Sequence, residues 1–280
     1  MLTGPPFVIL RKAEPNHRAA LRADQIFTGD ANGPAEAGGL SHHLVERVHG
    51  FGPANSRDRL HFFPALEDLE AGLRITNGWS ATARRLNDQF EVSVAFVNGK
   101  RCLGGMLELM MHCHFLVAVE DAQLGWPEAT LPVVPGMEGC HWPFRRAPQE
   151  QWPRLLRMLL TGESVRARDA VGWLADAAAP LPEALATAYG LATGAATTPA
   201  RRELRAGVLD GVPTEASGIA DPETEGIATA RRTIVQSLTE SARVPIAQAL
   251  EIQARIAAEF LASDACRQGR VGAEAARVLQ

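Results

Sequence analysis

The stretch of residues 92–146 constrains the fold of this chain more than any other part of the sequence. It contains two apolar runs, 92–97 and 115–119, that are rich in Val, Leu and Phe. Runs of this length and composition predict buried strands. Between them, Gly104 and Gly105 precede a short helical pattern. Strands that alternate with helices predict an α/β protein with a mostly parallel arrangement of strands.

Helical patterns lie on both sides of this stretch. Apolar residues recur at helical spacing over 65–90, with a possible break at Asn77 and Gly78, and again over 226–262. Residues 207–224 are rich in Gly, Pro, Thr and Asp, which predicts an exposed loop. The remaining predictions are a strand at 6–10 and helices at 138–146 (interrupted by Pro143), 152–160 and 169–174.

The composition narrows the class of protein. Hydrophobic residues make up 46% of the 280 residues and charged residues 21%, an ordinary balance for a globular chain. The net charge of −4 provides no basic field for nucleic acid or an anionic membrane. No run of apolar residues is long enough to predict a membrane span, and the first residues do not resemble a secretory signal. We therefore expect a cytoplasmic location.

Some of the cysteines and histidines are candidate metal ligands by residue type. Four cysteines are scattered along the chain without a CxxC pair, which predicts reduced thiols rather than a disulfide framework. His112, Cys113 and His114 are consecutive, and Cys140 is followed by His141. Consecutive side chains on a strand point to opposite faces and do not converge on one ion. We predict no metal site.

A candidate for acid–base chemistry follows the two glycines. Gly105 comes directly before a predicted helix start, where unpaired N–H groups and the helix dipole favour a negatively charged oxygen. Glu108 lies one turn further along this helix, and Glu128 closes a short apolar segment, interpreted as a strand. Burial at that position would raise the pKa of Glu128 and suit it to proton transfer. Alternatively, Glu108 is a solvated helix residue and Glu128 an ordinary carboxylate at the end of a strand.

Several short motifs occur in a characteristic order around these residues. They are Val-Ala-Phe-Val-Asn-Gly at 94–99, Gly-Gly-Met-Leu-Glu-Leu at 104–109, Ala-Gln-Leu-Gly-Trp-Pro-Glu at 122–128, and Pro-Gly-Met-Glu-Gly at 135–139. Together they resemble the crotonase (enoyl-CoA hydratase/isomerase) family. The resemblance implies a ββα spiral core followed by C-terminal helices that mediate assembly. On this basis the chain is divided into a core, 1–175, and a helical C-terminal region, 176–280.

The resemblance also implies roles for particular residues. Glu108 and Glu128 match the two acid/base glutamates of the hydratase members, and the N–H of Gly105 matches one half of an oxyanion hole for a thioester carbonyl. Gly29 is the candidate for the other half. The residues implied in binding the acyl-CoA are Lys12, Gly104, Trp126 and Gly136. For Arg145 and Arg146, two interpretations stay open: they bind the phosphates of coenzyme A, or they lie on a solvated helix face.

The sequence departs from the family pattern at several positions. Met106 occupies the place of a third glycine, and His114 that of an aspartate after the cysteine. The N-terminal half matches poorly, and residues 27–63 form an atypical segment that we interpret as an insertion over the acyl pocket, or else a partner polypeptide supplies the missing strands.

The resulting hypothesis is the hydration of an enoyl-CoA thioester or the reverse dehydration. Coenzyme A would enter as part of the substrate, with no separate cofactor, and the assembly would be a homotrimer or a hexamer. One alternative is another crotonase reaction, such as hydrolysis, isomerisation or ring hydration, on a cyclic or aromatic-derived acyl-CoA. A second is a non-catalytic structural partner of an acyl-CoA enzyme.

Overall fold

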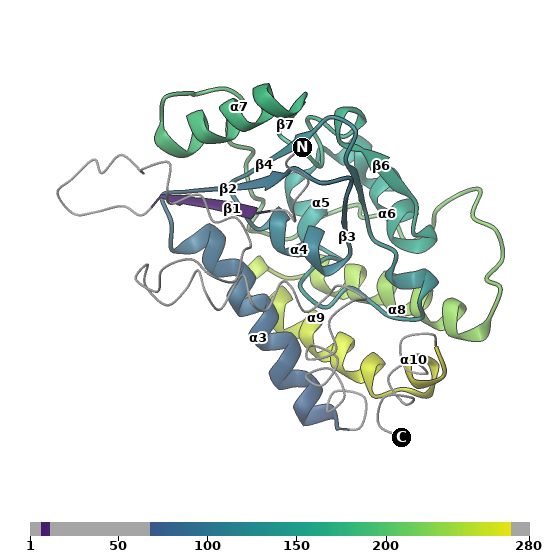
Figure 1. Cartoon of the computed structure of the whole chain (residues 1–280). Coiled ribbons are helices and arrows are strands. Elements are labelled where there is room, and N and C mark those ends of the chain that lie inside the picture. Colours follow the sequence, from purple (N-terminus) through teal and green to yellow (C-terminus); the bar gives the residue numbers. More distant parts are fainter. Residues whose placement is uncertain (1–6, 12–67, 270–280) are drawn as a thin grey trace, which may run out of the picture.

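The computed structural model describes residues 7–11 and 68–269, and two small sheets lie at its centre (Figure 1). The first sheet has the strand order β1-β2-β4-β7, with bounds Phe7–Arg11, Val92–Val97, Phe115–Val119 and Ala177–Ala179. The second has the order β3-β5-β6, with bounds Arg101–Leu103, Gln123–Gly125 and Ser164–Arg166.

Strands β2 and β4 form the centre of the first sheet. They pair in parallel, with Val94 opposite Phe115, and β7 continues the parallel order on β4, while β1 adds to β2 in the antiparallel sense. Both strands are buried along almost their whole length, because one face packs on the main core and the other on helix α7 (Leu181–Thr193). Burial on both faces explains why these strands read as continuous apolar runs.

The helices surround these sheets. A long helix, α3, covers the lower part of the molecule in Figure 1 and lies beside α9. The other helices are shorter, and those after β7 are α7, α8, α9 and α10. Their bounds are α3 Leu69–Asp88, α4 Gly105–Met111, η3 Glu128–Thr130, α5 Trp142–Arg146, η4 Gln149–Gln151, α6 Trp152–Thr161, η5 Ala167–Asp169, α8 Glu225–Ala242, α9 Ile246–Leu261 and α10 Asp264–Gln268.

Small residues allow α3 and α9 to approach closely. A Cβ built on Gly72 would lie 3.2 Å from the Cβ of Ala258, so nothing larger than hydrogen fits there without a shift. One turn further on, the hydroxyl of Thr76 donates to the carbonyl of Ala254 at 3.1 Å. Asp68 caps the N-terminus of α3 by accepting hydrogen bonds from two backbone N–H groups. Among the described residues, no helix has the length and apolar character of a membrane span.

The predicted α/β class is confirmed, and several local predictions are corrected. The segment 65–90 contains a single helix without a break at Asn77 and Gly78, because α3 packs on α9 along its length. The helix predicted at 169–174 is absent: a 3-10 turn ends at Asp169, and Gly172 has φ +89°. Pro143 lies in the first turn of α5 and therefore does not interrupt it.

Candidate active site

Glu108 is held in the interior by the turn at 136–139. It lies in α4, whose first residue is Gly105, and its side chain is buried. Its Oε2 accepts hydrogen bonds from the N–H groups of Met137 and Gly139 at 2.7 and 2.8 Å. A Cβ built on Gly139 would lie 2.6 Å from this oxygen, so the close approach depends on glycine.

Glu128 approaches the same end of α4 from the other side. The structure corrects the expectation that it ends a strand: β5 ends at Gly125, and Glu128 begins the 3-10 helix η3. The N–H of Gly104 donates to the carbonyl of Gly125 at 2.9 Å, which ties α4 to β5. A Cβ built on Gly104 would lie 2.9 Å from Oε1 of Glu128. The Oε2 atom is buried and has no hydrogen-bond partner among the described residues.

Burial raises the pKa values of both carboxyl groups above their ordinary range. It raises the pKa of Glu108 to about 7, against the opposing effect of the hydrogen bonds from Met137 and Gly139. Burial also raises the pKa of Glu128 well above its usual value, and the nearby charge of Glu108 adds to this. Raised pKa values at two neighbouring carboxyl groups are typical of a site for acid–base chemistry.

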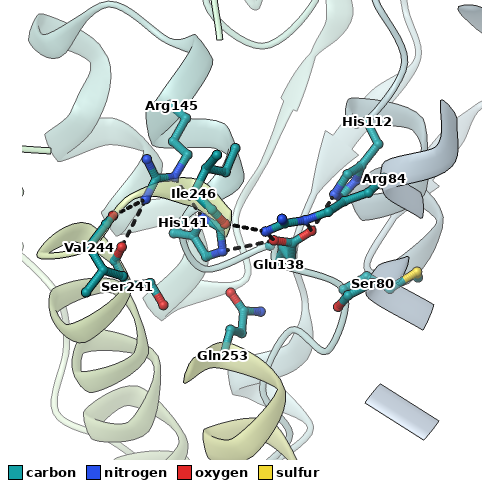
Figure 2. Close-up of polar contacts among 12 residues, drawn as sticks. Ser80, Arg84, His112, Glu138, His141, Arg145, Ser241, Val244, Ile246 and Gln253 are labelled. Atoms are coloured by element: carbon teal, nitrogen blue, oxygen red, sulfur yellow. Dashed lines mark hydrogen bonds and ion pairs between the residues drawn. The ribbon is translucent and has the colours of Figure 1, made fainter. Parts of the chain in front are cut away.

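The turn that holds Glu108 is itself fastened to two helices, α3 and α9. Gln253 of α9 donates to the carbonyl of Pro135 at 2.8 Å, and the ring of Trp79 of α3 lies against Gly136. The side chain of Glu138 lies among the basic residues Arg84, His112 and His141 (Figure 2). The position of the Glu108 carboxylate therefore depends on packing between distant parts of the chain.

The structure brings together four of the predicted site residues: Gly104, Gly105, Glu108 and Glu128. Gly136 belongs to the turn that holds Glu108. Trp126 is fully buried, and its indole N–H has no partner among the described residues. Gly29 and Lys12, together with the atypical segment 27–63, lie outside the described residues.

Both interpretations of Arg145 and Arg146 are wrong. The two guanidinium groups are buried, so neither lies on a solvated face or is free to bind a phosphate. Arg146 donates to the carbonyls of Met111, Cys113 and His114 at the end of α4. Arg145 donates to four backbone carbonyls, those of Arg205, Gly207, Ser241 and Val244. They hold segments of the core together.

The sequence interpretation missed the residues behind the turn, namely Arg84, Glu138 and the role of His112. The sequence contains part of the signal for this cluster, because His112 and His141 stand out as chemically active residues. Their neighbours suggested metal binding rather than a contact with a carboxylate. The structure gives them another partner, since both lie against the carboxylate of Glu138. Among the described residues, no group of three or more His, Cys, Asp or Glu side chains is arranged to hold a metal ion.

We expect Gly104→Ala to impair the site more than its backbone strain alone would. The residue has φ +61°, a region that costs other residues on the order of 1–3 kcal/mol, and the new methyl group would push against Glu128. Gly172→Ala is the matched control, because φ is +89° and nothing lies within 4 Å of the added Cβ. Urea unfolding and turnover would be measured for both variants. Equal losses of activity in the two would contradict a special role for Gly104.

The fold and the buried carboxylate pair define an α/β protein with a candidate acid–base site, and the comparisons with known proteins show which family it resembles. Residues 74–200 match the model described as enoyl-CoA hydratase/isomerase. Over this segment, a little under half of the chain, the protein is similar to the enoyl-CoA hydratase/isomerase (crotonase) family. The resemblance seen in the sequence is thus confirmed.

Two named relatives show how far the similarity extends. The fatty acid oxidation complex subunit alpha of Shewanella loihica is 30% identical over 190 residues, which are 61% of this chain and 25% of the relative. The peroxisomal fatty acid beta-oxidation multifunctional protein MFP2 of Arabidopsis thaliana is 39% identical over 104 residues, 34% of this chain and 13% of the relative. The matches therefore span a quarter or less of the length of these relatives.

A solved structure confirms the crotonase-like fold. The carnitinyl-CoA dehydratase from Mycobacterium thermoresistibile superposes with a TM-score of 0.54 over 78% of this chain and 69% of that chain. Its sequence identity of 17% is low, so the likeness concerns the fold alone.

Proposed function

We propose that this chain adds water to the double bond of an enoyl-CoA thioester, or removes it in the reverse reaction. The observation that carries the proposal is the meeting of two buried carboxyl groups, Glu108 and Glu128, at the N-terminal end of α4. Similarity to the family supports an acyl-CoA substrate, because the matching family model is named for hydration and isomerisation of enoyl-CoA esters.

In the proposed mechanism the two glutamates divide the proton transfers. Glu108, whose pKa is raised to about 7, would act in its ionised form and take a proton from the attacking water. Glu128, whose pKa burial raises well above its usual value, would hold the proton that passes to the α-carbon. The unfilled hydrogen-bonding capacity of its Oε2 supports this assignment, because a buried carboxyl oxygen normally has a partner.

The backbone N–H of Gly105 would stabilise the enolate oxygen of the thioester. It is the first residue of α4, so its N–H has no acceptor within the helix. Donors placed at a developing oxyanion contribute about 2.7–4 kcal/mol each to transition-state stabilisation. Gly29 is proposed as the second donor. Lys12, Gly104, Trp126 and Gly136 are proposed as further contacts to the acyl-CoA.

The pH profile of the wild-type protein tests the division of roles. An ionised base is present above its pKa, so we expect kcat/KM on an enoyl-CoA to rise with pH through about 7, where Glu108 loses its proton. It should fall again at higher pH, when Glu128 also ionises. Hydration would be followed through the absorbance of the conjugated thioester. Activity that does not change from pH 6 to pH 8, roughly one unit on each side, would contradict the roles of the pair.

A panel of thioesters separates this proposal from its alternatives. Straight-chain enoyl-CoA esters should be hydrated, whereas preference for cyclic esters would favour ring hydration, hydrolysis or isomerisation. Binding of acyl-CoA without turnover of any ester would favour a non-catalytic partner. We also propose that residues 176–280 mediate a homotrimer or hexamer, which mass photometry would measure directly.

A further inference from the structure

A buried ion-pair cluster lies next to the candidate site and takes no part in the proposed proton transfers. At its centre is Glu138, whose side chain has no exposed surface (Figure 2). Arg84 of α3 donates from Nε to Oε2 at 2.8 Å and from a terminal nitrogen to Oε1. The Nε2 atoms of His112 and His141 lie 3.1 and 3.3 Å from the same carboxylate. A carboxylate is buried in this way only when it is paired, because desolvating a lone charge is costly.

The backbone at Glu138 has a strained conformation, and this conformation lets the neighbouring N–H groups bind Glu108. Its φ of +68° is unusual for a residue other than glycine. The residues on either side, Met137 and Gly139, supply the two N–H groups that bind Oε2 of Glu108. A turn of this kind forms a small concave site for an anion. Strain persists at such positions when the surrounding structure enforces it, and here the surrounding structure is the cluster.

His112 provides a second connection between the cluster and Glu108. Its Nδ1 lies 2.8 Å from the carbonyl oxygen of Glu108, and its Nε2 faces Oε2 of Glu138. The ring therefore lies between the backbone of Glu108 and the carboxylate of Glu138. The cluster therefore touches Glu108 twice: at its backbone through His112, and at its carboxylate through the turn.

We propose that Glu138, held by Arg84 and His112, is a positioning residue that keeps the 136–139 turn in the conformation that binds the carboxylate of Glu108. The inference rests on the proposed role of Glu108 in catalysis. A glycine at position 138 would form the same turn with less strain, so the glutamate side chain serves a purpose that the backbone alone does not require.

The electrostatic consequence has a definite sign. The N–H groups of the turn lower the pKa of Glu108, and the charge of Glu138 raises it. Loss of Arg84 would loosen the turn and leave the charge of Glu138 less neutralised, so both effects raise the pKa of Glu108. The other titratable groups that face Glu108 are Glu128 of η3 and the buried thiol of Cys140.

The test compares Arg84→Met with Arg74→Met in the full-length protein. Both arginines lie on α3, but Arg74 pairs with Glu70 at the surface, which makes it the matched control. In Arg84→Met we expect hydrogen–deuterium exchange of peptides covering 133–142 to rise about tenfold, because the turn opens more often. We expect kcat to fall by roughly 10- to 100-fold with a smaller change in KM, and the acidic limb of kcat/KM to move to higher pH. Arg74→Met should change none of these.

Arg84→Lys keeps the charge but loses the two-point contact with the carboxylate, so it should give intermediate exchange and partly restored kcat. It also allows the comparison if Arg84→Met does not fold. Two results would overturn the proposal. One is a folded Arg84 variant whose hydrogen–deuterium exchange at the turn is unchanged. The other is an Arg84 variant whose turn exchanges faster but whose kcat equals that of the Arg74 control. If Glu108→Gln retains full activity, the proposed function fails, whereas the exchange measurement still reports whether the cluster holds the turn.

Discussion

Replacement of Glu128 by glutamine is expected to lower kcat on an enoyl-CoA by a factor on the order of 10² or more, the contribution of a general acid or base. Glutamine has nearly the same shape but cannot deliver a proton. Burial raises the pKa of Glu128 well above its usual value, which favours the neutral carboxyl form, and the amide resembles that form. Stability should therefore change little, and the loss should be confined to the chemical step.

The control for this prediction is Glu150→Gln. Glu150 is an exposed residue of η4, so its variant should keep the wild-type kcat. Turnover would be followed by the absorbance of the conjugated thioester, and urea unfolding would verify that both variants are folded. A Glu128→Gln protein as active as the Glu150 control would eliminate Glu128 from the mechanism.

Replacement of Arg145 by methionine is expected to have the largest effect on stability. The side chain is fully buried and donates to four backbone carbonyls at 2.6–3.1 Å. Methionine fills much of the space but donates nothing, so buried acceptors lose their partners at about 1–3 kcal/mol each, partly offset where water reaches them. We expect the free energy of unfolding to fall by about 2–4 kcal/mol, measured by urea denaturation with a fluorescence signal.

Arg255→Met provides the comparison for this change. Arg255 lies on α9 and forms ion pairs with Glu240 and Glu259, but its side chain is 45% exposed. Such surface pairs contribute about 0–1 kcal/mol, so the midpoint of unfolding should hardly move. Similar midpoints for the Arg145 and Arg255 variants would show that the buried hydrogen bonds do not stabilise the fold as inferred.

The parts of the fold that the sequence predicted are those that depend on local patterns. The strands 92–97 and 115–119 have continuous apolar runs because both of their faces are buried. The helix after Gly105 and the loop at 207–224 likewise follow from neighbouring residues. The prediction of a helix at 169–174 was wrong because the local pattern did not decide the structure there. These residues form turns and an isolated bridge between Val171 and Ala175.

The residues of the candidate site likewise separate into those that local sequence motifs predict and those that only tertiary contacts define. Glu108 and Glu128 were found because their spacing belongs to a motif that can be read along the chain. The buried ion-pair cluster around Glu138 could not be predicted because its members come from different elements. Arg84 lies 54 residues before Glu138 and 162 residues before Ile246, whose carbonyl it also binds. Arg145 was misread for a related reason, because two adjacent arginines look the same whether solvent or carbonyls from residues 205–244 surround them.

The contacts of the 136–139 turn define the smallest unit of this protein that can carry the site. The segment that matches the family model ends at residue 200, yet Arg84 binds the carbonyl of Ile246 and Gln253 binds that of Pro135. A fragment limited to the matched segment would contain both glutamates but not these anchors from α9. Any dissection of the chain into autonomous pieces therefore has to keep α9 with α3 and the carboxylate pair.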